Sequence, residues 1–221
     1  MLKRKGNEHG LAWLFLGVFA ILAILVKMNA SSIQSIDDQG FQWLANLDGA
    51  GVTAFFSGIA TLASPAVTVL LMVVFSGFLY LKHYRLLGLF AITTFIGGDA
   101  LALGIKYLVA RLRPSNQLVA DTGYSFPSGH VFGTVLLVTI VLSLGLQFIA
   151  SRPLRAGLIV LGIVWILLVM ISRVYLRDHY TSDVAGSWLL AEGCWYQAKA
   201  WFCRWEPQLL TKLNQRRTTN R

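Results

Sequence analysis

Gly49–Leu81 reads GAGVTAFFSGIATLASPAVTVLLMVVFSGFLYL and contains no charged residue. This run of 33 residues is longer than the roughly 20 residues that a helix needs to cross the hydrocarbon core of a bilayer. Ser64 and Pro65 divide the run, because serine is a favoured N-cap and proline fits the first helical position. We therefore expect a membrane-spanning helix over Pro65–Leu81 and an interfacial helix over Val52–Ala63.

Similar apolar runs flank this segment along the rest of the chain. They are apolar on every face, whereas the strands of a membrane barrel alternate between apolar and polar residues. The prediction is an all-α fold, a single membrane-embedded domain over residues 1–221 with six transmembrane helices and basic tails at about 1–9 and 206–221. The other five expected spans are Leu11–Val26, Leu86–Ile105, Val131–Ser151, Ala156–Ser172 and Val184–Ala198.

The first of these spans could also be a signal peptide, because basic residues precede it. The residues that follow it, Met28-Asn29-Ala30, match a cleavage site only weakly, which favours a retained helix. The cysteines Cys194 and Cys203 fit neither a disulfide framework nor a metal-binding spacing. We interpret them as apolar filler.

Composition excludes a soluble protein, since 56% of residues are hydrophobic and 13% are charged, against about 25% charged residues in soluble domains. The net charge of +9 would suggest nucleic acid in a soluble chain. Basic residues also mark the cytoplasmic side of membrane proteins. If both termini lie in the cytoplasm, all but six of the 19 Lys and Arg residues fall on the cytoplasmic side. The positive charge is then mostly a topology signal, so we expect no nucleic-acid partner.

The six exceptions lie on the expected outward side, and five of them fall in two connections, after the third and the fifth span. The same connections hold two of the chain's four histidines, His130 and His179. A concentration of cations and histidines that opposes the topology rule requires a local explanation. The six cations are Lys27, Lys106, Arg111, Arg113, Arg173 and Arg177.

Two segments in the first of these connections favour anion binding. In KYLVARLRP, Lys106 and Arg113 are seven apart, so we expect both on one face of a helix that ends at Pro114. In FPSGH, Ser128 is expected to cap the next helix. Gly129 would let an anion approach the free amides of that helix.

The third segment, SRVYLRDHYTSD, begins at Ser172 and supplies the reactive groups. His179 and Asp183 are four apart, so the carboxylate can fix the imidazole tautomer. Fixed cations, a helix N-terminus and two histidines are what the cleavage of a phosphate ester requires: charge neutralisation, a nucleophile and a proton donor.

Together the segments resemble the three-part signature of the type 2 phosphatidic acid phosphatase superfamily, whose members are membrane lipid phosphatases. The resemblance implies that His179 attacks phosphorus to form a phospho-histidine, that Asp183 orients it and that His130 protonates the leaving alkoxide. It also implies that no metal or other cofactor is needed. The residues that it assigns to the phosphoryl oxygens are Lys106, Arg113, Ser128, Gly129 and Arg173.

The resemblance leaves the substrate open among phosphatidylglycerol phosphate, phosphatidic acid and undecaprenyl diphosphate. A lipid phosphotransferase, a vanadium haloperoxidase and a non-catalytic lipid carrier or scramblase could use the same residues. We expect a multi-pass protein of the cell membrane with the site on the outward face. Its oligomeric state is not determined by the sequence.

Several charged residues lie outside the signature. Arg111 and Arg177 could contact a lipid headgroup or simply be solvated, and Asp121 and Asp178 are expected to pair with them. Carboxyls inside spans are expensive. For Asp99 and Glu192 we expect hydrogen-bonded pairs that stabilise helix contacts.

Overall fold

The structure, a computed structural model, describes residues 6–47 and 49–219, and all regular elements within them are helical. The prediction of an all-α fold is therefore confirmed. The elements are α1 (Glu8–Lys27), α2 (Ser31–Leu44), η1 (Ala45–Leu47), α3 (Ala50–Leu62), α4 (Pro65–Leu81), α5 (Arg85–Val109), α6 (Gly129–Gly145), η2 (Leu146–Phe148), α7 (Arg152–Tyr175) and α8 (Thr181–Thr219).

Four of the described helices, α1, α5, α7 and α6 with η2, are long and apolar enough to cross a membrane. The pair α3 and α4, bent by 43° at the break between them, makes a fifth if it counts as one span. Ser64 and Pro65 lie at the N-cap and first turn of α4, as predicted. The number of candidate spans is therefore smaller than the six predicted. Helix α8, which contains the expected sixth span, is not among these candidates.

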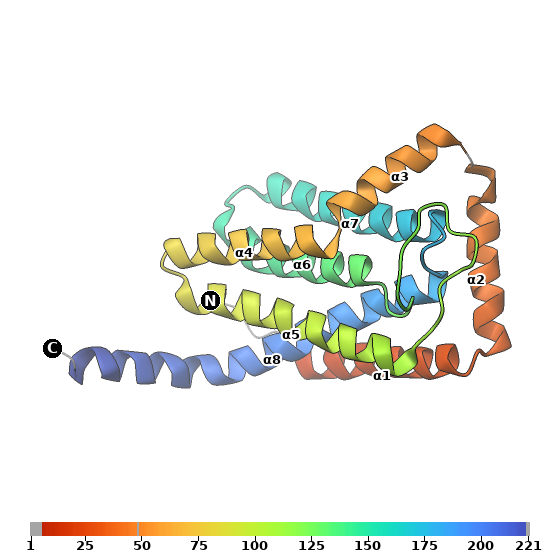
Figure 1. Cartoon of the computed structure of the whole chain (residues 1–221). Coiled ribbons are helices and arrows are strands. Elements are labelled where there is room, and N and C mark those ends of the chain that lie inside the picture. Colours follow the sequence, from red (N-terminus) through yellow and green to blue (C-terminus); the bar gives the residue numbers. More distant parts are fainter. Residues whose placement is uncertain (1–5, 48, 220–221) are drawn as a thin grey trace.

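The helices form a bundle whose two ends differ (Figure 1). Helix α1 packs along α8, and α8 also packs against α6. At one end, α2 crosses the bundle beside the two irregular connections at 110–128 and 176–180. The short connections between α4 and α5 and between α6 and α7 lie at the opposite end (Figure 1).

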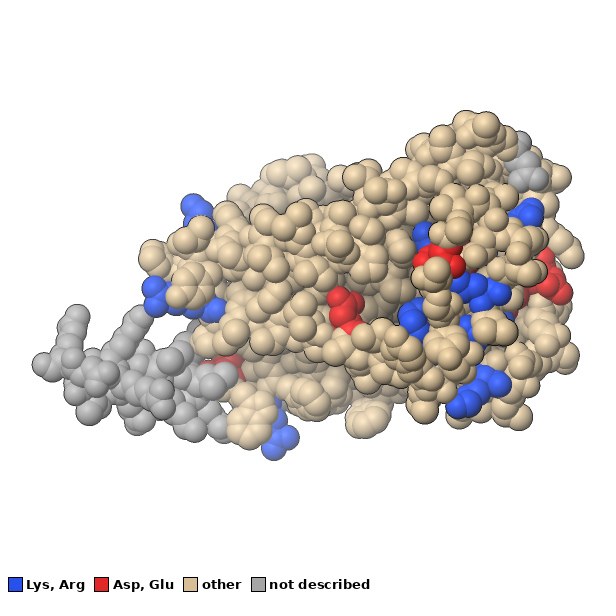
Figure 2. All heavy atoms as spheres, viewed as in Figure 1, with Lys and Arg blue, Asp and Glu red and all other residues tan. Residues whose placement is uncertain are grey.

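The charged side chains are also distributed unevenly along the bundle. In Figure 2 they gather at the end where α2 lies, and the middle of the visible face consists almost entirely of other residues. Lys82, in the connection between α4 and α5, and Arg152, the first residue of α7, lie at the other end from the 110–128 connection. The six exceptional cations thus occupy one end of the bundle.

Helix α5 ends before the position that the sequence suggested. Ala110 adopts a left-handed conformation (φ 55°), and no helix is present from there to Ser128. The expectation that Lys106 and Arg113 share one helical face was therefore wrong. Pro114 disfavours helical geometry in the residue before it and lacks an amide hydrogen for helix bonding, and here the chain leaves the helix a full turn earlier.

Close helix contacts stabilise the interior of the bundle. A Cβ on Gly98 of α5 would lie 2.9 Å from the side chain of Leu136 and 3.0 Å from that of Phe132 of α6, so a larger residue there would force these side chains to shift. Thr139 of α6 donates a hydrogen bond of 2.8 Å to Glu192 of α8. The hydrogen-bonded role expected for Glu192 is confirmed, whereas that of Asp99 stays a prediction.

Candidate active site

The short connection between α7 and α8 places His179 inside the charged end of the bundle. The ring is buried, and its Nε2 lies 3.1 Å from Nη1 of Arg113. A guanidinium can only donate hydrogen bonds, so Nε2 must accept this one. The ring proton of the neutral imidazole therefore resides on Nδ1, and the lone pair of Nε2 points towards the cations.

Asp183 faces the other side of the imidazole, as the four-residue spacing predicted. Its Oδ2 lies 3.5 Å from Nδ1 of His179, which is too long for a good hydrogen bond, so in this state the carboxylate acts mainly through its charge. The same oxygen accepts the amide hydrogen of Tyr180 at 2.9 Å. Asp183 is fully buried in the first turn of α8.

Burial and charge determine the protonation of this pair. Burial disfavours the imidazolium and lowers the pKa of His179 to about 4, although Asp183 opposes the shift. Burial alone would raise the pKa of Asp183, but His179 and Arg111 hold it below its usual value. Near neutral pH the site therefore contains a neutral imidazole beside an ionised carboxylate.

Two arginines meet next to Nε2 of His179. Asp121 bridges them with one oxygen, Oδ2, which lies 3.0 Å from Nη1 of Arg113 and 2.9 Å from Nη2 of Arg173. These distances are those of charge-assisted hydrogen bonds. The Asp121 carboxylate thus binds both guanidinium groups in the way that another anionic oxygen could.

The carboxylates pair differently from the prediction. Asp121 binds Arg113 and Arg173, and Asp178 lies 3.0 Å from Arg173, so the expected pairing of these carboxylates with Arg111 and Arg177 was wrong. The residues near the site are brought together by folded loops, which sequence spacing does not reveal. Burial favours a protonated Asp121, but Arg113, the amide of Thr122 and Arg173 together outweigh it and keep the pKa of this carboxyl below its usual value.

Lys106 and Arg113 meet at the same loop although they do not share a helix. Nζ of Lys106 donates to the carbonyl of Tyr124 at 2.8 Å, and Nε of Arg113 donates to the carbonyls of Thr122 and Gly123 at 3.1 and 3.2 Å. The irregular 110–128 connection therefore folds back over both cations. It places them at one end of the bundle in the way that a continuous helix was expected to do.

The start of α6 supplies the remaining residues of the signature. Ser128 is the N-cap, as predicted, and its hydroxyl accepts from the amide of Val131 at 3.5 Å. Its own amide donates to Ser187 Oγ at 2.7 Å. A Cβ on Gly129 would meet only Pro65, at 3.8 Å, so the backbone there is open to a ligand. The half-buried His130 lies within the electrostatic field of Arg173 and His179.

Arg111 is the main residue that the sequence left undecided. It is neither solvated nor free to meet a headgroup, because it forms ion pairs of 2.6 Å with both Asp37 and Asp183. Asp37 of α2 was not singled out at all. The available signal was a carboxylate in the connection after the first span, on the same expected side as an arginine without an assigned partner.

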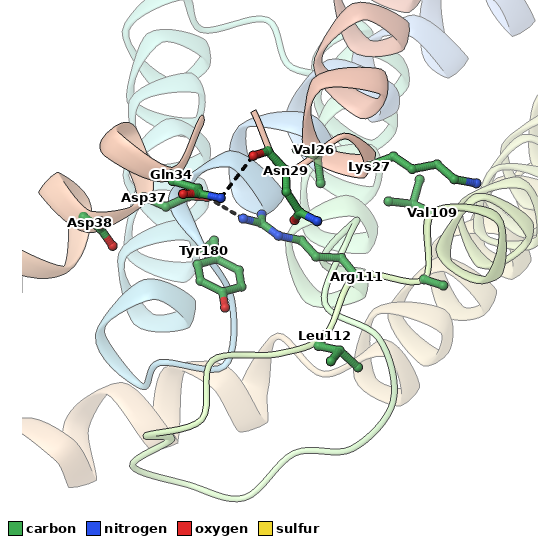
Figure 3. Close-up of a pocket in the computed structure, with 11 residues that line it drawn as sticks. Val26, Lys27, Asn29, Gln34, Asp37, Asp38, Val109, Arg111, Leu112 and Tyr180 are labelled. Atoms are coloured by element: carbon green, nitrogen blue, oxygen red, sulfur yellow. Dashed lines mark hydrogen bonds and ion pairs between the residues drawn. The ribbon is translucent and has the colours of Figure 1, made fainter. Parts of the chain in front are cut away.

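A cavity of about 480 Å³ opens beside this ion pair, between the end of α1, helix α2 and the start of the 110–128 connection (Figure 3). Arg111 and Tyr180 form part of its wall. Among the described residues, no group of three or more His, Cys, Asp or Glu side chains is close enough to hold a metal ion.

Fold and site together define the class of protein: an all-helical, multi-pass membrane protein with a buried histidine beside arginines and carboxylates at one end of its bundle. A family model described as the PAP2 superfamily matches residues 65–207, so the chain belongs to this family. The resemblance recognised in the sequence is thereby confirmed, and the protein is a hydrolase of the phosphatase type.

Individual relatives agree with this assignment. The chain is 29% identical to an undecaprenyl-diphosphatase of Sulfolobus acidocaldarius over 83% of its length and 86% of the relative's. It is also 29% identical to phosphatidylglycerophosphatase B of Bacillus subtilis, over 78% and 85%. The crystal structure of a transmembrane PAP2-type phosphatidylglycerolphosphate phosphatase from Bacillus subtilis shares the fold, with a TM-score of 0.76 at 23% identity, over 87% of this chain and 96% of that one.

Proposed function

We propose that the protein removes the terminal phosphate from a lipid phosphate or lipid diphosphate, through a phospho-histidine on His179 and without a metal. The observation that carries this proposal is the orientation of the imidazole. Its Nε2 faces the guanidinium of Arg113 at 3.1 Å, and its Nδ1 faces Asp183. That tautomer is the nucleophilic one for attack through Nε2.

In the first step, the lipid phosphate displaces Asp121 and binds Arg113 and Arg173. Lys106 and the open amides at Gly129 add positive potential around the remaining oxygens. Nε2 of His179 attacks phosphorus, a P–N bond forms and the bond between phosphorus and the leaving oxygen breaks. Asp183 stabilises the positive charge that develops on the imidazole.

The proton for the leaving oxygen comes from His130 in this mechanism, which turns the departing group into an alcohol or a lipid monophosphate. His130 then takes a proton from water, whose oxygen attacks the phospho-histidine. This breaks the P–N bond, releases inorganic phosphate and restores both histidines. Support for the role of His130 comes from its partly exposed position at the start of α6.

A lipid substrate agrees with the surroundings of the site and with the names of the relatives. Its tail would stay in the bilayer and enter sideways between helices, while the headgroup reaches the charged end. We propose six spans, with residues 184–198 of α8 as the sixth because they pack with α1 and α6, and cytoplasmic termini with the site on the outward face. The separation of basic residues between the two ends supports this orientation.

The test uses His179→Asn in purified protein, with His83→Asn as the matched control. His83 lies in the exposed turn between α4 and α5, in a left-handed conformation that asparagine tolerates. We expect His179→Asn to release no phosphate from phosphatidic acid, phosphatidylglycerol phosphate or undecaprenyl diphosphate in detergent, while His83→Asn keeps full activity. Retained activity in His179→Asn contradicts the proposal.

Two further measurements separate the alternatives. A substrate labelled in its terminal phosphate should label the protein at an acid-labile bond, and the label should then appear as free phosphate. Label that moves to another lipid instead indicates a phosphotransferase, and lipid transport that survives the loss of both histidines indicates a carrier. Addition of EDTA should leave the rate unchanged.

A further inference from the structure

Arg111 lies on the side of the catalytic pair that faces away from the phosphate-binding arginines. Its Nη2 contacts Oδ2 of Asp37 and its Nη1 contacts Oδ1 of Asp183, each at 2.6 Å. The guanidinium also covers the ring of Tyr180, 3.8 Å from the ring centre. All three charged side chains are almost completely buried, so a partner that is removed leaves an uncompensated charge inside the protein.

Asp37 connects α2 to the first turn of α8. Its Oδ1 accepts the amide hydrogen of Ser182 at 2.8 Å, and its Oδ2 accepts the hydroxyl hydrogen of the same residue at 2.9 Å. First-turn amides have no partner within their own helix, so Asp37 satisfies a group that would otherwise be orphaned. Helix α2 thereby holds the helix end that carries Asp183. Figure 3 shows Asp37 and Arg111 joined beside Tyr180.

The two oxygens of Asp183 have separate partners. Oδ1 receives the hydrogen bond from Arg111, and Oδ2 receives the amide of Tyr180 and faces Nδ1 of His179. A carboxylate without Arg111 could rotate about its side-chain bonds, and either oxygen could then turn away from the imidazole. Arg111 therefore selects the orientation in which Asp183 meets His179.

We infer that Arg111 and Asp37 are positioning residues of the reaction, a buried clamp that fixes Asp183 against the nucleophilic histidine. The inference rests on the proposed function, because it assigns the clamp to the attack by His179. Asp37 lies outside residues 65–207, the part that the family model matches. Helix α2, which lies outside the matched region, thus helps to position Asp183 for the reaction.

The clamp has an electrostatic signature that a purely structural contact lacks. Arg111→Gln leaves two adjacent buried carboxylates without their shared cation, so Asp183 takes up a proton at a higher pH and activity is lost at a higher pH. Asp37→Asn removes the neighbouring negative charge and shifts this loss in the opposite direction. The groups that face Asp183 are Arg111 from the 110–128 connection, Asp37 from α2, His179 and Tyr180 from the connection before α8, and Lys106 from α5.

The experiment measures kcat and KM for phosphate release from a short-chain phosphatidic acid in detergent, across pH, with the full-length protein. The variants are Arg111→Gln, Arg111→Lys and Asp37→Asn, and the matched control is Asp38→Asn, whose side chain is exposed on α2. We expect kcat of Arg111→Gln to fall by about 100-fold, as for a misplacement of about 1 Å, with little change in KM. Arg111→Lys should recover part of the loss, and Asp38→Asn should resemble the unmodified protein.

The acidic limb of the kcat profile should move to higher pH in Arg111→Gln and to lower pH in Asp37→Asn. Unchanged kcat in both variants overturns the inference. So does a rise in KM alone, which indicates headgroup binding, or a loss of kcat with the pH profile unmoved in both, which indicates a purely structural contact. Should Arg111→Gln not fold, Arg111→Lys and Asp37→Asn carry the same test.

The two proposals fail separately. An inactive His179→Asn together with fully active Arg111 and Asp37 variants retains the phosphatase mechanism and removes the clamp. An active His179→Asn removes the mechanism itself.

Discussion

Gly40→Ala is the sharpest perturbation of the contact between α2 and α8, because it changes one methyl group and no charge. Gly40 is buried on α2, three residues after Asp37. A Cβ built there would lie 1.9 Å from Oγ1 of Thr181, the first residue of α8. It would also lie 3.2 Å from Cβ of Thr181, so rotation of the threonine side chain alone does not relieve the crowding.

The magnitude follows from these distances. Ordinary contact begins near 3.4 Å, so α2 and α8 must separate by a few tenths of an ångström if the Thr181 side chain rotates and by up to about 1.5 Å if it does not. Overpacking of this kind destabilises a protein by about 1–3 kcal/mol, and the better helix propensity of alanine offsets up to about 1 kcal/mol of it. The larger effect is on the rate, because Asp37 moves with α2. A displacement of about 1 Å in the catalytic geometry lowers kcat by about 100-fold.

The assay combines thermal unfolding in detergent with kcat for phosphate release. Thr181→Ala is the partner variant, because its buried Oγ1 has no hydrogen-bond partner among the described residues and its removal should be nearly neutral. The double variant should recover most of the lost kcat. Gly17→Ala on α1, whose new Cβ meets no atom within 4 Å, should remain fully active. Full activity of Gly40→Ala, or no recovery in the double variant, would refute the reasoning.

Three other predictions concern the site and the bundle. Burial lowers the pKa of His179 to about 4 from 6.5, so the imidazole of the folded protein stays neutral down to about pH 4. The unfolded chain takes up this proton at a higher pH, so the melting temperature should fall as the pH drops from 6.5 to 4, and His179→Asn should remove that part of the fall. Asp121→Asn should lower the inhibition constant of inorganic phosphate several-fold, because the carboxylate no longer competes for two arginines; an unchanged constant would contradict the bridging role. Thr139→Val should leave Glu192 without its donor and destabilise the protein by about 1–3 kcal/mol with kcat unchanged, whereas Thr139→Ser should retain most of the stability.

The sequence was a good guide to residues that act through local geometry. Ser128 caps α6 and His179 faces Asp183 because both relations are local: each joins a residue just before a helix to one three or four positions later, in the first turn of that helix. The helix end at Pro114 was placed too late. The sequence contains no glycine at the true end, where Ala110 adopts a left-handed conformation that alanine seldom takes.

The pairing of charges was beyond the reach of the sequence. Asp121, Asp178 and Arg111 could each choose among several partners of opposite sign, and spacing along the chain does not rank them. The folded 110–128 connection decides the choice, because it brings Asp121 to Arg113 and Arg173 and sends Arg111 towards α2. Loop conformation depends on contacts with distant elements, so local sequence carries little information about it.

By itself, the sequence determined that this chain is helical and built for a membrane, and it named the histidines and cations that we propose form one phosphate site. These properties follow from composition and from short spacings, which any fold of the chain must respect. Only the tertiary structure decided which tautomer His179 adopts, that Asp121 bridges Arg113 and Arg173, and that Asp37 reaches Asp183 through Arg111. The physical reason is that ion pairs between distant segments depend on how helices cross, and a crossing such as that of α2 and α8 is set by packing over the whole molecule.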